Sequence, residues 1–373
     1  MIAIATTNPD TVAETYVRQH IREIAPGQTA VLYFQGKASS LKDEPRYRVD
    51  YGKHSPLSWR LRSLGNFLKY AYPGAITGST AKGTRAFLEK HNVQAILAEF
   101  GPTGCALLPI CKAMGIRLIV NFHGYDATVM PNRWLIRRAY RYLNAHADGF
   151  VCGSRHFAGI LEKLGFSREK IEVIPCGIEI EKFNPHLGKD KNLLVAVGRF
   201  TEKKAPHLTI QAFSKVKANY PNIRLEMIGE GALLTTCKQL CQTLKLEESV
   251  TFHGAQSHDF VKAKLAHAGL FVQHSVTAQN GDMESQGISL LEAMASGVPV
   301  ISTRHNGFTE TVAEGKNGYL VAEKDVDGMA EAISTLLGDD ALRKRMGAEG
   351  RKLVEEKFDS VEQAKRLRHI LMR

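Results

Sequence analysis

Short apolar runs alternate with longer amphipathic stretches along this chain of 373 residues. Such alternation is typical of parallel strands joined by crossover helices, so it predicts an α/β protein. The first half has candidate strands at residues 2–6, 29–34, 95–100, 117–122, 149–154 and 171–177. A second series is expected at residues 193–200, 224–231, 249–254, 270–275, 298–302 and 318–322. The two series predict two doubly wound parallel sheets.

Polar residues, Pro185 and Gly188 interrupt both periodicities between residues 178 and 192, as expected of a linker. The sequence therefore predicts a first domain over 1–184 and a second over 185–357. We expect the C-terminal helix, at about 358–373, to pack back on the first domain. Since ligands bind outside the carboxyl ends of parallel strands, two facing sheets would form a cleft between the domains.

The chain carries 49 Lys and Arg against 38 Asp and Glu, a formal net charge of +11. This excess favours an anionic partner such as a lipid surface or a phosphorylated substrate, and we find no recognition module for nucleic acid. The six cysteines lack the paired spacing of a zinc site, which favours reduced core thiols of a cytoplasmic protein. Without a basic leader or a run of about 18 apolar residues, the chain is expected to be cytoplasmic or peripheral on the inner face of the membrane.

Two acids flank a glycine in the stretch GDMESQGISLLEAMASGVPVIS, which predicts a loop followed by a helix. With Gly287 at the helix start, the backbone N–H groups of Gln286, Gly287 and Ile288 would form an anion site for phosphate. Glu284 stands in the loop beside that site. Glu292 lies about one and a half turns into the helix, within reach of a nucleotide's sugar. A solvated loop acid and a surface helix acid are the alternative.

A second candidate site is GRFTEKK, where Arg199, Lys203 and Lys204 follow a strand that ends at Gly198. Cations at the carboxyl end of a strand lie where a diphosphate would bind, and the arginine fork matches its oxygens. A plain solvated loop is the alternative. In GEGALL, Gly229 follows another strand and is expected to shape a turn near the base of a nucleotide.

Together, GRFTEKK and ESQGISLLEAMASGVPVIST resemble the retaining glycosyltransferases of family four, whose GT-B fold has two Rossmann-like domains facing across a cleft. The resemblance extends over nearly the whole chain, including VIPCGIEIEKF and GAEGRKLVEEKF. It implies that Glu284 lies near the donor sugar and that Glu292 bonds the ribose. It also implies that Arg199 and Lys204 hold the diphosphate and stabilise the leaving group. The chain departs from many relatives at ESQG and at Ala205, where a glycine often follows the lysine, which puts the accepted sugar in question.

The segment NFHGYDA is similar to the His-Gly-x-Asp segment of the same family. The resemblance places His123 near the donor sugar and gives Asp126 the role of steadying the loop. In HNGFTETV, Gly307 and Glu310 match the family's glycine turn followed by an acid, which makes them donor-side neighbours. A structural histidine and an ordinary capped helix are the respective alternatives.

No metal and no cofactor is expected, because the nucleotide sugar is itself a substrate. The acid pair in DVD, residues 325–327, is explained as helix-start acids. The resemblance implies that cationic side chains and a helix start offset the leaving diphosphate.

Two basic amphipathic segments, at residues 57–72 and 133–143, carry Trp and Tyr among their apolar positions. Either would suit an anionic membrane surface, where the enzyme would meet a lipid-linked acceptor. The alternative for each is a helix packed on its own sheet with a solvated basic face.

The expected activity is that of a retaining, hexosyltransferase-type enzyme. It would move a sugar from a nucleotide sugar to a hydroxyl of a carbohydrate or lipid-linked acceptor. The resemblance supplies the pathway, which is cell-surface polysaccharide or glycolipid assembly. Two alternatives stay open: a GT-B-like sugar-nucleotide epimerase, and a non-catalytic basic binding protein.

Overall fold

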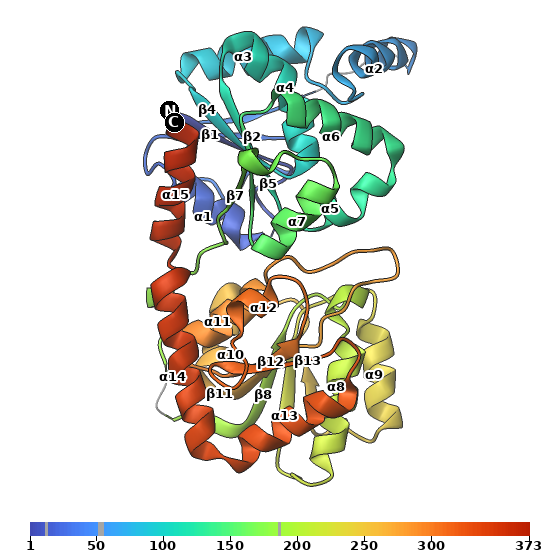
Figure 1. The fold of residues 1–373 in the computed structure, drawn as a ribbon, viewed down its shortest axis with the longest axis vertical. Coiled ribbons are helices and arrows are strands. Elements are labelled where there is room, and N and C mark those ends of the chain that lie inside the picture. The colour runs from blue at the N-terminus through green and yellow to red at the C-terminus, as the bar shows by residue number, and fades with distance from the viewer. Residues whose placement is uncertain (12–13, 51–55, 186–187) are drawn as a thin grey trace. The chain divides into compact units, whose positions relative to one another are not determined.

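The structure is a computed structural model that describes residues 1–11, 14–50, 56–185 and 188–373. It divides into two compact units (Figure 1). The first unit is Met1–Gly177 together with Ser360–Arg373, and the second is Ile178–Asp359.

The division falls at residue 177, whereas the sequence placed the domain boundary at residue 184. The reason lies in the expected linker, whose apolar side chains Ile178, Ile180 and Phe183 are buried in the core of the second unit. Polar interruptions hid this burial because the segment forms only a short 3-10 turn there.

The described residues of the first unit form one seven-stranded parallel sheet in the order β3-β2-β1-β4-β5-β6-β7. The register places Ile4 of β1 beside Val31 of β2 and Leu97 of β4. The strands are β1 (Ile2–Thr6), β2 (Thr29–Tyr33), β3 (Arg46–Arg48), β4 (Ala95–Glu99), β5 (Arg117–Phe122), β6 (Gly149–Cys152) and β7 (Ile171–Val173). The sequence prediction missed β3, because this short edge strand is polar and lacks an apolar run.

Helices flank this sheet, and Figure 1 shows the last of them, α15, beside the first, α1. The helices are α1 (Thr15–Glu23), α2 (Pro56–Tyr70), α3 (Gly78–Lys90), α4 (Gly101–Met114), α5 (Tyr125–Thr128), α6 (Trp134–His146), α7 (Arg155–Lys163) and α15 (Ser360–Met372). The strands β1 and β4 are buried along their whole length. This burial explains their uninterrupted apolar runs, since helices cover both faces of a parallel sheet.

The described residues of the second unit form a six-stranded parallel sheet in the order β10-β9-β8-β11-β12-β13. Its strands are β8 (Asp190–Val197), β9 (Arg224–Ile228), β10 (Val250–Phe252), β11 (Ala268–Val272), β12 (Val300–Thr303) and β13 (Gly318–Val321). Its helices are α8 (Pro206–Lys217), α9 (Leu234–Thr243), α10 (His258–His267), α11 (Ile288–Ala295), α12 (Phe308–Thr311), α13 (Val326–Gly338) and α14 (Asp340–Lys357). Both units thus have the doubly wound α/β fold predicted from the sequence.

The strand order reverses between β1 and β4 in the first unit and between β8 and β11 in the second. Loops leave the sheet in opposite directions at such a switch point, and ligands of open α/β sheets bind in the crevice that results. In the second unit, a ligand site is therefore expected among the residues that follow β8 and β11.

Helix α15 belongs to the first unit although it follows the whole of the second. It packs against α1, β4 and β5, and Figure 1 shows it beside α1. Leu367 and Leu371 are buried, and Nε of Arg117 donates to the carbonyl of Ile370 at 2.9 Å. These contacts account for the apolar positions of a helix that has no strand after it.

None of the six cysteines, all of which lie in the described part of the chain, forms a disulfide, and all but the half-buried Cys176 lie in the core, as the sequence predicts. Among the described residues, no helix combines the length and apolar composition needed to cross a membrane.

Candidate functional site

Two glycines bring the ends of β8 and β9 together in the second unit. Gly229 has φ +141°, and a Cβ atom there would lie 2.0 Å from the carbonyl oxygen of Gly198. Only glycine fits this close approach of two backbones. The turns after the two strands therefore form one continuous rim at the carboxyl end of the sheet.

Three cations follow β8 on this rim, and each has a different environment. Nζ of Lys204 lies 2.8 Å from Oε2 of Glu284. Nζ of Lys203 is buried and donates to Oδ1 of Asp282 at 3.1 Å, so Lys203 holds the loop that carries Glu284. Arg199 is exposed, and its guanidinium makes no hydrogen bond or ion pair within the described parts of the chain. Lys203 therefore anchors the loop that carries Glu284. The other two cations, Arg199 and Lys204, lie on the rim, where an anion could reach them.

A small pocket opens at the switch point between β8 and β11. Gly198, Arg199, Lys204 and Gln273 are among the residues that line it. With its amide oriented to satisfy all its neighbours, Gln273 accepts from Nζ of Lys204 at 3.3 Å and donates to the carbonyl of Val197 at 3.0 Å. The ammonium of Lys204 is therefore oriented from two sides.

The carboxyl group of Glu284 is ionised at neutral pH. Burial by itself would raise its pKa, but the charges of Lys204 and Lys203 lower the pKa from 4.5 to about 2. An ionised carboxylate cannot donate a proton, so Glu284 is not a general acid in this state. It can stabilise positive charge or hold hydroxyl groups.

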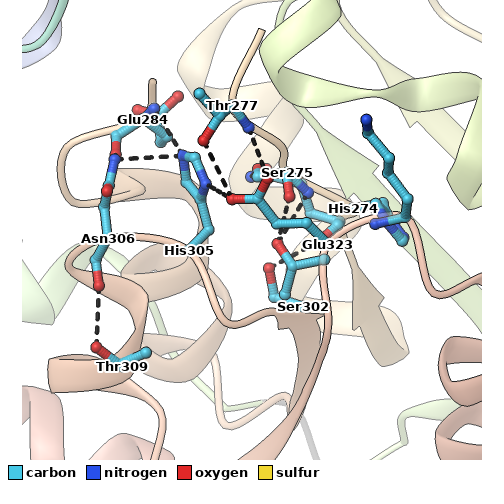
Figure 2. A network of polar contacts seen from close by, with 12 residues as sticks. His274, Ser275, Thr277, Glu284, Ser302, His305, Asn306, Thr309 and Glu323 are labelled. Atoms are coloured by element: carbon cyan, nitrogen blue, oxygen red, sulfur yellow. Dashed lines mark hydrogen bonds and ion pairs between the residues drawn. The ribbon is translucent and has the colours of Figure 1, made fainter. Parts of the chain in front are cut away.

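The backbone of Glu284 is held by the segment that follows β12 (Figure 2). Its N–H donates to Nε2 of His305 at 3.0 Å, and its carbonyl accepts from Nδ2 of Asn306 at 2.6 Å. Because both backbone groups are bonded, the position of the Glu284 side chain is set by the second unit itself.

The tautomer of His305 follows from these bonds. Nε2 accepts a hydrogen bond from the backbone N–H of Glu284, so Nδ1 carries the imidazole proton and donates to Oε1 of Glu323 at 2.5 Å. Burial lowers the pKa of His305, which favours this neutral form. The other oxygen of Glu323 accepts from the backbone N–H of Thr277 at 2.9 Å. Figure 2 shows that the network joins both ends of the loop between β11 and α11.

The start of α11 has the backbone conformation expected for an anion site. Gly287 precedes Ile288, the first residue of the helix, and has φ +76°. A Cβ atom at Gly287 would lie 2.4 Å from the ring of Phe308. No side chain caps the helix start, and Gln286 is buried beside it. The first N–H groups of α11 remain able to bind an anion.

Glu292 points to a different neighbour from Glu284. It is buried in α11, and its Oε1 lies 2.8 Å from Nε2 of His258 at the start of α10. The structure therefore separates the two acids of the stretch by partner: Glu284 pairs with a lysine on the rim, and Glu292 with a histidine on another helix.

The expected donor-side neighbours Gly307 and Glu310 lie around α12. Gly307 immediately precedes the helix and is buried. Glu310 lines a separate pocket with Lys316 and Glu349. The hydrogen bonds to the Glu284 segment come instead from His305 and Asn306, immediately before Gly307.

In the first unit, a fully buried acid on β4 binds two histidines. Oε2 of Glu99 lies 2.6 Å from Nε2 of His123, and Oε1 lies 2.6 Å from Nδ1 of His20. Nδ2 of Asn121 also donates to Oε2, at 3.1 Å. Burial opposes the charge of Glu99, but the two histidines lower its pKa to about 2.

His123 is correspondingly cationic. Burial would lower its pKa, but hydrogen bonds with Cys176 and Glu99 raise it from 6.5 to about 10. The ring packs against Tyr16, with centroids 4.4 Å apart. Asp126 lies three residues after His123 in the chain. Its carboxylate accepts hydrogen bonds from the backbone N–H of His123 at 3.0 Å and from the backbone N–H of Gly101 at 3.0 Å. The Asp126 carboxylate thus holds the loop that carries His123.

Two protein-family models together match nearly the whole chain. "Glycosyltransferase Family 4" matches residues 13–182, and "Glycosyl transferases group 1" matches residues 177–353. A candidate colanic acid biosynthesis glycosyltransferase, WcaL of Escherichia coli strain K12, is 31% identical over 79% of this chain and 75% of its own length. The chain belongs to the family-four glycosyltransferases.

A second similar protein is a GDP-mannose-dependent α-(1-6)-phosphatidylinositol monomannoside mannosyltransferase of Mycolicibacterium smegmatis. It is 27% identical to this glycosyltransferase over 73% of the chain and 75% of its own length. Among solved structures, Anabaena HepE in complex with UDP and glucose has a TM-score of 0.80 at 18% identity, with 100% of this chain and 99% of that one covered. The fold of this glycosyltransferase is GT-B.

The backbone accounts for one departure of this glycosyltransferase from its relatives. Ala205 has φ +37° and ψ +51°, which is the left-handed conformation that glycine adopts most easily. The alanine therefore occupies a glycine-type turn between Lys204 and α8, so the turn itself is retained.

Both acids of the segment 325–327, Asp325 and Asp327, have partners within the protein. Asp325 caps α13 by accepting from the N–H of Gly328 at 2.8 Å, and Asp327 pairs with Lys215. Among the described residues, no group of three or more His, Cys, Asp or Glu side chains is arranged to hold a metal ion.

Several residues of this glycosyltransferase's candidate site were not predicted from the sequence. They are His20, Glu99, His258, His305, Asn306 and Glu323. A usable signal existed for Glu323, which comes directly after the predicted strand 318–322, and for His305, which lies three residues after the predicted strand 298–302. None existed for His20 or His258, which lie on helices and reach the site only through packing.

Proposed function

We propose that this protein transfers a sugar from a nucleotide sugar to an acceptor hydroxyl with retention of the anomeric configuration. The observation that carries the proposal is the Lys204–Glu284 pair, 2.8 Å apart at the switch point of the second unit. A cation beside a phosphate-binding helix start and an ionised acid are suited to the two charges that form when a glycosidic bond to a diphosphate breaks.

In the proposed reaction, Arg199, Lys204 and the N–H groups at the start of α11 hold the diphosphate. As the bond breaks, negative charge grows on the leaving phosphate, which these donors stabilise. The ionised Glu284 stabilises positive charge on the sugar. Same-face attack by the acceptor, as the family resemblance suggests, gives retention. The resemblance also supports contact of His123 with the donor sugar, and we expect no metal to take part.

The acceptor is proposed to be a carbohydrate or a lipid-linked sugar in polysaccharide or glycolipid assembly. Two relatives support this class, one named for colanic acid biosynthesis and the other for a phosphatidylinositol mannoside. A lipid-linked acceptor would bring the enzyme to the cytoplasmic face of an anionic membrane, in agreement with the net charge of +11.

The site assignment is tested by Lys204→Ala, Glu284→Ala and Glu292→Ala. Removing Lys204 or Glu284 should lower kcat by about 100-fold or more, as for loss of one oxyanion donor. Glu292→Ala should mainly weaken nucleotide binding. A thermal-shift screen of UDP, GDP, ADP and their sugars selects the donor, since a ligand of the folded state raises its stability.

Lys215→Ala is the control, because Lys215 pairs on the surface with Asp327 in the same unit. Unchanged kinetics in all three site variants would refute the assignment. Nuclear magnetic resonance of the product tests retention, and an inverted linkage would exclude it. Interconversion of sugar nucleotides without release of a nucleoside diphosphate would favour the epimerase instead.

A further inference from the structure

Helix α2 turns an apolar face away from its own unit. Leu61, Leu64 and Leu68 are 63%, 55% and 70% exposed, and their spacing puts them on one side of the helix. On the opposite side, Asn66 is buried and its amide donates to the carbonyls of Pro73 and Ala75. A surface helix ordinarily buries its apolar face and exposes its polar one. In α2 this arrangement is reversed.

The neighbouring helix α6 extends the exposed apolar surface. The rings of Phe67 on α2 and Trp134 on α6 are 5.7 Å apart, and the guanidinium of Arg138 lies 5.0 Å from the Phe67 ring. Figure 1 shows α2 and α6 on the same side of the first unit. We call this surface the leucine–tryptophan patch, and its members are Leu61, Leu64, Leu68, Trp134 and Leu135.

Exposed large apolar side chains are concentrated in this patch. Within the described parts of the chain, the others are Trp59, Tyr125, Val361 and Met372. Isolated exposed apolar residues are ordinary, whereas a contiguous group indicates an interaction surface. The rest of α6 is a conventional helix that buries Ile136 and Leu143. The patch is therefore a feature of α2 and the first turn of α6.

The charged residues in the segments that carry the patch are basic. Arg60 and Lys69 are exposed on α2, and a helical period of 3.6 places them on opposite flanks of the leucine row. The sequence has no Asp or Glu from residue 56 to residue 88, nor from residue 127 to residue 147. The complementary partner is therefore anionic.

We propose that the leucine–tryptophan patch docks on an anionic lipid surface. The leucines would enter the boundary between headgroups and acyl chains, while Arg60 and Lys69 extend to the lipid phosphates. Trp134 suits the same boundary, because indole is both apolar and a hydrogen-bond donor. The 15 residues of α2 are fewer than the ~20 that a membrane-spanning helix needs, so the helix lies on the membrane.

The inference deepens the proposed function, since docking would bring the enzyme to a lipid-linked acceptor. Lipid binding itself requires no sugar transfer. It can therefore be measured on the whole protein with Lys204→Ala in place, so that failure of docking and failure of the proposed catalysis remain distinguishable.

The experiment uses vesicles of phosphatidylcholine with and without phosphatidylglycerol, at low and high salt. Trp134 belongs to the patch, so its fluorescence, measured with the other tryptophan replaced by Trp59→Phe, reports docking directly. We expect a blue shift and co-sedimentation with the anionic vesicles at low salt, both weakened by high salt. Phosphatidylcholine alone should give neither.

Two variants separate the apolar and ionic contributions. The triple variant Leu61→Ser, Leu64→Ser, Leu68→Ser should lower the vesicle partition coefficient at least about tenfold. Arg60→Gln with Lys69→Gln should remove most of the salt dependence. The matched control is Val361→Ser with Met372→Ser, which removes two exposed apolar side chains of α15 and should leave partitioning unchanged. All variants should retain nucleoside diphosphate release with a water-soluble acceptor.

The proposal is overturned if the wild type does not bind anionic vesicles at low salt, or if the triple leucine variant binds as tightly as the wild type. It is also overturned if the patch joins two copies of the chain. In that case the protein would sediment as a dimer without lipid, and the triple variant as a monomer.

Discussion

The charge of His123 is supported by Cys176 and by Glu99, a completely buried residue 24 positions earlier. Such a carboxylate is stable inside the protein only when partners compensate its desolvation, and here two histidines and Asn121 do so. Glu99 is a positioning residue: it orients His123 and supports its protonation without itself being part of the rim in the second unit.

The pH dependence of this pair can be predicted with its sign. The pKa of His123 is raised from 6.5 to about 10, so its contribution to stability is complete below pH 6.5 and is lost as pH rises toward 10. The pKa of Glu99 is lowered from 4.5 to about 2, so its contribution is complete above pH 4.5 and is lost as pH falls toward 2. Glu99→Gln should therefore destabilise the protein most between pH 4.5 and 6.5.

Nuclear magnetic resonance of the imidazole carbon tests this directly. His123 should remain protonated at pH 8 in the wild type, and in Glu99→Gln its pKa should fall below about 10, while the hydrogen bond with Cys176 remains. Glu323→Gln is the control, because Glu323 bonds His305 and should leave His123 unchanged. A wild-type His123 that titrates near 6.5 would contradict the prediction.

At the scale of the element, α11 has a start that only glycine permits. Gly287 combines a positive φ with the ring of Phe308 at the place where a Cβ would stand. A side chain there would move either the phenyl ring or the first N–H groups of the helix. The anion site and the packing of α12 are thus coupled through one residue.

The coupling predicts the outcome of Gly287→Ala. Gly315 is a matched control, because it has φ +71° against +76° for Gly287 and nothing within 4 Å of its Cβ position. Gly315→Ala should cost about 1 kcal/mol for the backbone conformation alone. Gly287→Ala should cost about 1–3 kcal/mol more through overpacking, and should weaken nucleotide binding. Urea unfolding followed by circular dichroism measures the free energy of unfolding of both variants. Equal losses in the two variants would show that the Phe308 ring moves aside without a cost in stability.

At the scale of the whole molecule, the first unit is completed by the last residues of the chain. Arg366 donates to the carbonyl of Val173, and Arg373 pairs with Glu172. Within the second unit, Ile178 bridges to Asp359. The chain thus passes from the first unit to the second and back at two adjacent positions, residues 177–178 and 359–360.

Stability of the first unit should therefore depend on α15. Leu371→Ala removes a buried side chain and should cost about 2–5 kcal/mol. Val361→Ala is the control on the same helix, because Val361 is 51% exposed, and should change stability by less than about 0.5 kcal/mol. Both tryptophans lie in the first unit, so urea unfolding followed by their fluorescence isolates it. Equal effects of the two changes would show that α15 contributes little.

The sequence alone determined the features that depend on local periodicity and spacing. Buried parallel strands are continuous apolar runs, so twelve of the thirteen strands among the described residues could be placed, and the polar edge strand β3 was missed. Loops after strands carry ligands in such folds, so Lys204, Glu284 and Gly287 were predicted as site residues from their positions after strands. The structure brought Lys204 and Glu284 to 2.8 Å.

Tertiary structure alone decided which side chains meet across long separations and which face of a helix points outward. Glu99 reaches His20 across 79 positions, and Glu292 reaches His258 across 34. No local pattern encodes such pairs, since each depends on the packing of separate elements. The segments 57–72 and 133–143 likewise have similar basic, amphipathic sequences. Only their packing shows that α6 buries most of its apolar residues while α2 exposes Leu61, Leu64 and Leu68.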